Sequence, residues 1–269
     1  MTRNNVVYTA KNEGVIGNAE ILCDGITVLT GPNGCGKSTI LEAVAEEKQL
    51  PEYCATSPYW EPRSWIGSSM HVLRNHEGRR EITENKATEI LNEIKRIIGG
   101  YFFVKDEPYA TDVFFSSDDP CRGICESFRC SSGVGVFGLL QIALQYDAWN
   151  GDSLVVFDSF DAYLSPDWIV EYARLIVLIN KTLGTRFLIA THNPEMVSAI
   201  RYISEAEETL GVARFYLAKK NDDGRYDYRE CVEDEKNIEP IFKFFAIALD
   251  KISEYSREEA WGEGGDENQ

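Results

Sequence analysis

The sequence is poor in basic residues, in histidine and in long apolar runs. Its 27 lysine and arginine residues stand against 44 aspartate and glutamate residues, which gives a formal net charge of −17 at pH 7. This excess of acid disfavours strong, nonspecific binding of a nucleic-acid backbone by the chain as a whole, although a local basic groove or a basic partner is compatible with it. We therefore expect contact with nucleic acid only indirectly.

Two segments that mark membrane and secreted proteins are missing. The densest apolar segment, Leu175–Ile179, is far shorter than the ~18 residues that cross a bilayer. The first residues, Met1–Asn5, lack the apolar core of a signal peptide. We expect a soluble, cytoplasmic protein that has no membrane partner.

The seven cysteines are an odd number, which suits a reducing compartment better than a disulfide framework. Cys121, Cys125 and Cys130 lie close together in the sequence, but their spacing matches no common zinc pattern. The chain has only three histidines with which to complete a site. Three ordinary thiols are the favoured interpretation, and structural zinc is the alternative.

A glycine-rich segment, Gly31–Thr39, fits the phosphate-binding pattern G-x-x-x-x-G-K-S/T at every required position. The apolar, β-branched run Gly25–Thr30 before it predicts a buried parallel strand, and Thr39–Glu46 after it predicts an amphipathic helix. A chance glycine-rich turn, the alternative, would not need this context on both sides. The segment therefore predicts a site for ATP or GTP.

The chemistry of the motif assigns roles to its residues. Glycines let backbone N–H groups curl round a phosphate, and the N-terminus of the following helix adds a partial positive charge. Lys37 would reach the β- and γ-phosphates, and the Ser38 hydroxyl would bind Mg²⁺. Tyr8 either stacks on the base or packs in the core. The predicted nucleotide-binding residues of this segment are Asn33, Gly34, Cys35, Gly36, Lys37, Ser38 and Thr39.

Strand and helix patterns alternate along the chain and predict an α/β fold with a doubly wound, mostly parallel sheet. The expected strands cover 6–10, 19–22, 25–30, 101–104, 113–115, 153–158, 186–190, 212–217 and 226–228, the last two as a hairpin. The expected helices cover 39–46, 83–98, 135–146, 166–184 and 238–255, with another beginning at 193–194.

We expect one domain over residues 1–260. The mostly parallel sheet is accompanied by a small antiparallel β part, and residues 50–128 form a helical or irregular insert, of which residues 50–80 have no assignable secondary structure. Residues 261–269 are rich in glycine and acid and predict a disordered tail.

An acid, Asp158, ends the buried strand 153–158. A carboxylate at the carboxyl end of a strand that neighbours the phosphate loop can hold the Mg²⁺ shell. Acids often follow buried strands, so the pattern alone is weak. Its position after the phosphate loop strengthens it.

Three further segments resemble those of ABC-type ATPases. Residues 157–166, Phe-Asp-Ser-Phe-Asp-Ala-Tyr-Leu-Ser-Pro, resemble the Asp-Glu-Pro-Glu-x-x-Leu-x-Pro segment of that class. Ser131–Gly133 resembles its Ser-x-Gly signature loop, and Thr191–Asn193 resembles the segment with its switch histidine. The subgroup resembled is that of the small AAA-type ABC ATPases related to the OLD, RecF and SMC proteins, many of them found in bacterial anti-phage systems.

The resemblance implies a P-loop NTPase of ABC-ATPase type whose cofactors are ATP and Mg²⁺. In that family two chains pair head to tail, so that Ser131 and Gly133 of one chain would contact the γ-phosphate bound by the other. It also implies that His192 senses the γ-phosphate. The simpler interpretations are an ordinary helix N-cap for Ser131 and an ordinary loop histidine for His192.

Two departures from the family pattern matter. The catalytic glutamate that follows the strand acid is Ser159 here, and a serine has no carboxylate to activate water. Asp161 lies near enough to substitute, although it aligns with the second acid of the family. No glutamine lies between Gln49 and Gln141, so the usual glutamine ligand is missing or replaced. We expect slow hydrolysis, with Asp158, Ser159, Asp161 and His192 as the catalytic candidates.

The resulting hypothesis is an ATP-binding ABC-class homodimer that regulates a protein effector in anti-phage defence. The alternatives are a DNA-repair or SMC-like ATPase, a transporter ATPase subunit and a pseudo-ATPase scaffold. The first would need a basic surface and usually a long coiled coil, which are not visible in the sequence, and the missing glutamine disfavours the second. Ser159 keeps the third open.

Overall fold

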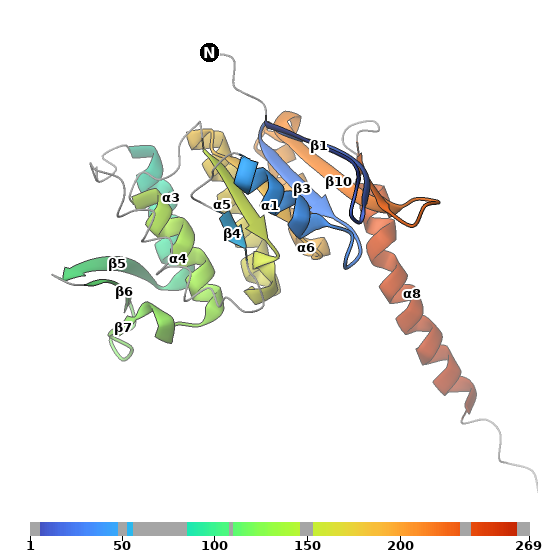
Figure 1. Ribbon diagram of the computed structural model, residues 1–269. Helices are drawn as coiled ribbons and strands as arrows, with labels where there is room; N and C mark the ends of the chain where they lie inside the picture. The colour runs from blue at the N-terminus through green and yellow to red at the C-terminus, as the bar shows by residue number, and fades with distance from the viewer. Residues whose placement is uncertain are drawn as a thin grey trace, which may run out of the picture.

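An eight-stranded sheet forms the centre of the computed structural model, which describes residues 6–47, 53–55, 85–107, 110–145, 153–231 and 238–262 (Figure 1). The strand order is β1-β2-β11-β10-β3-β9-β8-β4. The bounds are β1 Val6–Glu13, β2 Ile16–Cys23, β3 Ile26–Thr30, β4 Tyr53–Ala55, β8 Leu154–Asp158, β9 Arg186–Ala190, β10 Ala213–Lys220 and β11 Tyr226–Glu230.

The pairing in this sheet is mostly parallel. The two hairpins β1–β2 and β10–β11 are antiparallel, and every other neighbouring pair is parallel. This mixed α/β fold confirms the predicted class. Parallel sheets need cover on both faces, and the apolar residues of β3, β8 and β9 alternate between two hydrophobic clusters as the period of two requires.

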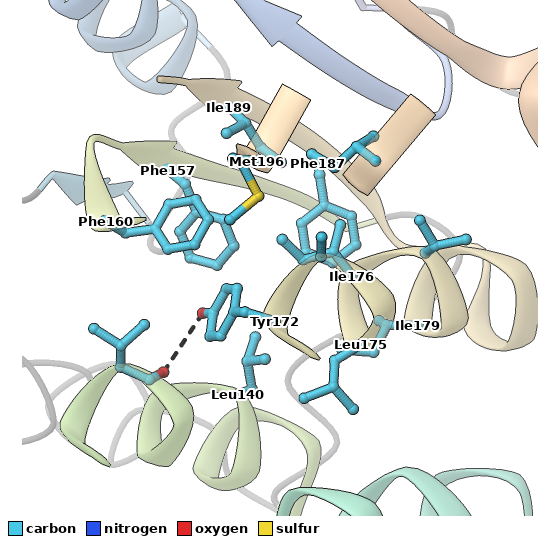
Figure 2. Packing of buried hydrophobic residues seen from close by; sticks show 14 of the residues in the cluster. Leu140, Phe157, Phe160, Tyr172, Leu175, Ile176, Ile179, Phe187, Ile189 and Met196 are labelled. Carbon is cyan, nitrogen blue, oxygen red and sulfur yellow. Dashed lines mark hydrogen bonds between the residues drawn. The ribbon is translucent and has the colours of Figure 1, made fainter. Parts of the chain in front are cut away.

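The larger cluster lies between the sheet and helices α4 (Ser132–Gln145), α5 (Pro166–Leu183) and α6 (Pro194–Ala206). Figure 2 shows its centre, where Phe157 and Phe187 from the strands meet Tyr172 of α5. The Tyr172 hydroxyl donates to the Val136 carbonyl of α4 at 3.4 Å, which joins the two helices through a polar contact inside the core. The second cluster lies between the opposite face of the sheet, the β1–β2 hairpin and α1 (Lys37–Glu47).

Local sequence signals place the helices that follow β8 and β9. Pro166 begins α5, and Gly184 in the left-handed conformation ends it. Asn193 caps α6, because its side-chain oxygen accepts from the backbone N–H groups of Glu195 and Met196 at 2.8 and 3.1 Å. Such a cap stabilises a helix by about 1 kcal/mol.

A second sheet of three antiparallel strands, β5-β6-β7, lies with α3 (Asn85–Ile98) at the end of the molecule opposite α8 (Figure 1). Its strands are β5 Gly100–Glu107, β6 Ala110–Ser117 and β7 Ile124–Glu126. Residues of α3, β5 and β6 belong to the same hydrophobic cluster as α4 and α5. The insert is therefore packed on the main body, and its description as part of one domain stays a prediction.

Gln141 of α4 attaches this second sheet to the core. Its Nε2 donates to the Phe102 carbonyl at 2.8 Å, and its Oε1 accepts from the Phe102 N–H at 3.0 Å. Phe102 lies on β5, an edge strand, so the buried amide of Gln141 pairs with backbone groups that no neighbouring strand reaches.

Several predicted boundaries were wrong. Helix α8 covers Glu239–Gly262 rather than 238–255, so the first two residues of the predicted disordered tail form its last turn, and 263–269 lie outside the described residues. The polar region 50–80 contributes β4, whose backbone pairs with β8; the rest of it, and the predicted cap Thr83, lie outside the described residues. Helix α4 begins at Ser132, three residues earlier than expected.

Two further predictions concern the position of Tyr8 and the membrane-spanning helices. Tyr8 is buried in the second cluster, which favours the core-packing interpretation. Of the helices in the described ranges, none combines the length and the apolarity that crossing a bilayer requires.

The Gln141 amide generates a prediction about stability. Replacing Gln141 with leucine leaves two buried backbone groups of Phe102 without partners, and we expect the free energy of unfolding to fall by about 2 kcal/mol or more. Urea denaturation followed by circular dichroism measures the change. The control is Gln145→Leu, a similar substitution one turn later at a partly exposed position. Equal midpoints for the two variants would contradict this account.

Candidate functional site

The predicted phosphate loop connects β3 to α1. Gly34 and Gly36 have φ angles of 75° and 94°, the left-handed region that L side chains rarely adopt, and they turn the chain sharply. The first hydrogen bond of α1 joins the Ile40 N–H to the Gly36 carbonyl at 3.0 Å. The N–H groups of Lys37, Ser38 and Thr39 precede it and are left to serve a ligand at the helix N-terminus.

This loop forms one wall of a cavity of about 520 Å³. Residues from three loops line it, those after β3, β8 and β9, together with Val15 from the β1–β2 turn. The lining residues are Val15, Asn33, Gly34, Cys35, Gly36, Lys37, Ser38, Thr39, Asp158, Ser159 and His192. All seven residues predicted from the glycine-rich segment therefore lie at one cavity with Asp158, Ser159 and His192.

Lys37 is almost fully buried, with 6% of its surface exposed. Its ammonium group donates to the carbonyls of Gly31 and Pro32, each at 3.1 Å, and to the Cys35 sulfur at 3.5 Å. Burial lowers the pKa of Lys37, while the Cys35 sulfur and the Asp158 carboxylate act in the opposite direction. The carbonyl groups of the loop therefore hold the Lys37 ammonium group in place at the lining of the cavity.

Asp158 and Ser159 lie at the carboxyl end of β8. The Ser159 hydroxyl donates to Asp158 Oδ1 at 3.1 Å, and the Ser159 N–H donates to the Ala190 carbonyl of β9 at 2.9 Å. Ser159 has a φ of 51°, uncommon for a residue with a Cβ. This backbone turn places the side chain that follows the strand acid against the cavity.

His192 lines the cavity, where the loop after β9 passes the phosphate loop. Burial lowers its pKa first and the charge of Lys37 second, while Asp158 and a hydrogen bond to the Gly31 backbone oppose the shift. The ring is therefore neutral at pH 7 and has one nitrogen that donates and one that accepts.

Asp161 lies behind the cavity rather than on its lining. It is 4% exposed, and its carboxylate accepts a short hydrogen bond from the Thr191 hydroxyl, which itself accepts from the Asn193 N–H at 2.9 Å. This bond joins the loop that carries Asp158 to the loop that carries His192. The proposed role of Asp161 as a substitute base stays a prediction, and in this conformation its carboxylate is occupied by Thr191.

Tyr228 of β11 is a part of the site that sequence reasoning missed. Its buried hydroxyl donates to the Cys35 carbonyl at 3.2 Å and lies 3.5 Å from the Cys35 sulfur. Burial raises its pKa, so the hydroxyl keeps its proton. The contact braces the phosphate loop from beneath. No local sequence pattern predicts this contact, because 193 residues separate Cys35 and Tyr228.

Ser131 and Gly133 lie outside the cavity, at the start of α4. The Ser131 hydroxyl accepts from the Val134 N–H at 3.4 Å and its carbonyl accepts from the Gly135 N–H at 3.0 Å, the arrangement of a helix N-cap. A Cβ on Gly133 would lie 3.1 Å from the Tyr163 carbonyl, so this glycine permits close packing. Within one chain the two residues do not contribute to the cavity.

The residues at the cavity fit a nucleoside triphosphate with Mg²⁺. Backbone N–H groups, the Lys37 cation and the Ser38 and Thr39 hydroxyls suit phosphate oxygens, and the hydroxyl and carboxylate oxygens of Ser38 and Asp158 are the hard ligands that Mg²⁺ prefers. Within the described ranges, the cavity included, no group of three or more histidine, cysteine or acidic side chains is placed to hold a metal ion.

The buried Asp161 generates a pH prediction. Burial raises its pKa from 3.8 to about 6, against the Thr191 hydrogen bond. Between these values the folded chain keeps a proton that the unfolded chain has lost, so stability falls as the pH rises through this window, by about 3 kcal/mol. An asparagine at position 161 has no proton to lose in this window, so it adds no pH dependence to the stability. Its side-chain oxygen can still accept a hydrogen bond from the Thr191 hydroxyl.

We therefore expect the stability of Asp161→Asn, relative to wild type, to increase from pH 4 to pH 6.5 and then to level off. Urea denaturation across this range measures the difference. In a second pair of proteins, Thr191→Val removes the hydrogen bond that stabilises the carboxylate, and the upper end of the window should move to higher pH. Parallel stability curves for wild type and Asp161→Asn would refute the raised pKa.

Comparisons with known proteins agree with this geometry. A family model described as an AAA domain matches residues 12–45, the β1–β2 turn through the phosphate loop to α1. No curated protein matches the sequence significantly.

Solved structures match over most of the chain. An SMC head bound to the C-winged helix domain of ScpA matches with a TM-score of 0.54 and 13% identity, over 84% of this chain and 97% of the other. The SMC head domain from Thermotoga maritima matches with a TM-score of 0.48 and 14% identity, over 83% and 97%. A bacterial ABC transporter cassette, in a dimeric structure, matches with a TM-score of 0.46 and 15% identity, over 84% and 95%.

The first of these matches establishes the fold. In this chain the shared fold consists of a mostly parallel sheet, a second, antiparallel sheet and a phosphate loop at the start of the first helix. The chain thus has the P-loop fold of the SMC heads, and its phosphate loop lies in the segment that matches an AAA domain.

Proposed function

We propose that this chain binds ATP with Mg²⁺ at the cavity and hydrolyses it slowly. The observation that carries the proposal is the convergence of the phosphate loop, Asp158 and His192 on one cavity. These groups come from three separate segments, and each supplies a different part of phosphate chemistry. Lys37 and the α1 N–H groups bind phosphate oxygens, and Ser38 and Asp158 bind the metal.

His192 would act on the terminal phosphate. His192 lines the cavity, and its ring N–H, turned from the Gly31 backbone toward a γ-phosphate oxygen, would donate a hydrogen bond to it. The bond between Asp161 and Thr191 ties this histidine's loop to the loop of Asp158. A change in the contact between His192 and the phosphate would therefore be transmitted through this bond to Ser159, the residue next to Asp158.

The site is proposed to be completed by a second copy of the chain. The cavity has cationic and hydroxyl groups on the side of the phosphate loop, whereas Ser131 and the first turn of α4 present another helix N-terminus outside it. A head-to-tail pair would bring Ser131 and Gly133 of one chain to the γ-phosphate held by the other. Nucleotide would then close the homodimer, and hydrolysis would open it.

Hydrolysis is proposed to be slow because of Ser159. A serine hydroxyl that donates to Asp158 has no basic group with which to take a proton from water. The same observation favours a second candidate function, a scaffold that binds nucleotide without turning it over. The two differ in whether any turnover accompanies ATP-dependent pairing.

The pairing of two chains would serve to control a protein effector, in anti-phage defence. This role, and a cytoplasmic location, are proposed from the sequence resemblance alone. Purification of the protein from its native operon, with and without nucleotide, would identify the effector.

A mixing experiment tests the composite site. We expect Lys37→Ala to lower ATP affinity by roughly 10- to 100-fold, because it removes a charge-assisted hydrogen-bond donor, and Ser131→Arg to bind ATP but not to pair. Mixed together, the two variants form a heterodimer with one intact site. Because neither variant pairs with itself, an equimolar mixture should pair only as heterodimers, and turnover should recover to at most about half of wild type, since one site in two is intact.

Each variant alone is the control, measured by light scattering and phosphate release. Full activity of isolated Ser131→Arg would disprove a contribution across the interface. Unchanged ATP affinity of Lys37→Ala would disprove the nucleotide site itself.

The missing base generates the next prediction. Ser159→Glu restores a carboxylate after the strand acid, and we expect turnover to rise by roughly two to four decades. Ser159→Gln is the matched control. Glutamine has nearly the same size as glutamate and is strained to the same extent by the positive φ at this position, but it has no carboxylate to act as a base. Phosphate release under single-turnover conditions gives the rates. A glutamate variant no faster than the glutamine variant would rule out the missing base as the cause of slow turnover.

A further inference from the structure

Two cysteine thiols meet where the second sheet joins α4. Cys125 lies on β7, whose register pairs it with Phe115 of β6, and Cys130 ends the short 3-10 turn Ser127–Arg129. Their sulfur atoms are 3.8 Å apart. Both side chains are partly exposed and pack on the edge of the large cluster. The thiols are therefore in contact with each other and within reach of small solutes.

The turn between the two cysteines holds them together. The Cys130 N–H donates to the Ser127 carbonyl at 3.1 Å, and Arg129 forms an ion pair with Glu126 at 3.3 Å. Both interactions close the chain on itself over the six residues from Cys125 to Cys130. The contact between the sulfurs is thus built by local backbone structure, and modest side-chain rotation would shorten it to the ~2.05 Å of a disulfide.

We propose that Cys125 and Cys130 form a reversible disulfide when a peroxide is present. One thiolate attacks the peroxide O–O bond and becomes a sulfenic acid, releasing hydroxide, or water once that is protonated. The second thiol then attacks this sulfur, the S–S bond forms, and water leaves. In sum, two thiols and one hydrogen peroxide give one disulfide and two waters. A dithiol reductant reverses the bond by exchange.

The position of the pair gives the bond a consequence. Cys130 directly precedes Ser131, the N-cap of α4, and the first turn of this helix is packed tightly where Gly133 faces Tyr163 and the Trp168 ring. Any part of the shortening from 3.8 Å to ~2.05 Å that side-chain rotation does not supply would move the start of α4. A displacement of about 1 Å in a positioning group is enough to lower activity by roughly 100-fold.

This consequence rests on the proposed function, because it requires Ser131 to contact the nucleotide of a second chain. The oxidised protein would bind ATP at its phosphate loop but would pair less well. A transient disulfide of this kind is compatible with a reducing compartment, where disulfides serve as sensors rather than as structural links.

The sequence allows the bond to be identified without ambiguity. Trypsin cleaves after Lys105, Arg122, Arg129 and Arg174, so Cys121, Cys125 and Cys130 fall in three separate peptides. The full-length protein is reduced, freed of reductant, treated with hydrogen peroxide, blocked with N-ethylmaleimide and digested. We expect mass spectrometry to find peptide 123–129 linked to peptide 130–174, and to lose the link after treatment with dithiothreitol.

The functional arm compares ATP-dependent pairing before and after peroxide. We expect oxidation to weaken pairing of the wild type by about tenfold or more, and dithiothreitol to restore it. Cys125→Ser, which leaves Cys130 and Ser131 in place, should be insensitive to peroxide, whereas Cys121→Ser should respond as the wild type does. Because all these proteins keep Cys35, an effect of peroxide on the phosphate loop would appear equally in each.

The outcomes separate the two proposals. A link to the Cys121 peptide, or both Cys125 and Cys130 blocked as thiols, overturns the disulfide. A disulfide that forms without weakening the pairing of the wild type overturns its control of α4. If the reduced protein fails to pair with ATP at all, the proposed function fails together with that control, and the linked peptides still decide the disulfide.

Discussion

Strands β3, β9 and β8 are parallel and in register, and this pairing creates the site. Leu29, Ala190 and Asp158 lie side by side at the carboxyl ends of the three strands. The loops that follow must therefore leave the sheet at one level, where the phosphate loop, Ser159 and His192 surround one cavity. Ligands of open α/β sheets bind at this edge for the same geometric reason. Few side-chain interactions are needed to bring the three segments together.

The bond between Asp161 and Thr191 adds rigidity to this arrangement at a cost. Burying a carboxylate removes its hydration, and a single hydroxyl donor replaces only part of it, which explains why the Asp161 pKa rises to about 6. In return, the loops after β8 and β9 are joined directly. A buried polar link that weakens the fold while it couples two functional loops is characteristic of sites rather than of cores.

The part of the site that the sequence predicted is the part encoded locally. Strand, glycine turn and helix start occupy consecutive residues from Gly25 to Glu46, and Asp158 ends an apolar strand, so pattern and order predicted them, whereas His192 was predicted from the family resemblance. Val15, Tyr228 and Thr191 could not be predicted in the same way. Val15 comes from another hairpin, Tyr228 braces the loop across 193 residues, and the role of Thr191 depends on the unforeseen burial of Asp161. The end of α8 was placed too early because the large apolar residues of its described second half, Ile247, Leu249, Ile252 and Tyr255, are exposed, so no buried stripe marks where the helix stops.

The insert has a structural role that its sequence did not indicate. Helix α4 begins with Ser131 as its cap, and its middle is fastened to β5 by the Gln141 amide while its first residue follows the contact between Cys125 and Cys130. The position of the helix start therefore depends on the second sheet at two points, one within the helix and one just before it. Any signal that moves β5–β7 would move the start of α4 without touching the phosphate loop. The proposed binding of phosphate and the proposed pairing of chains would thus depend on different ends of the molecule.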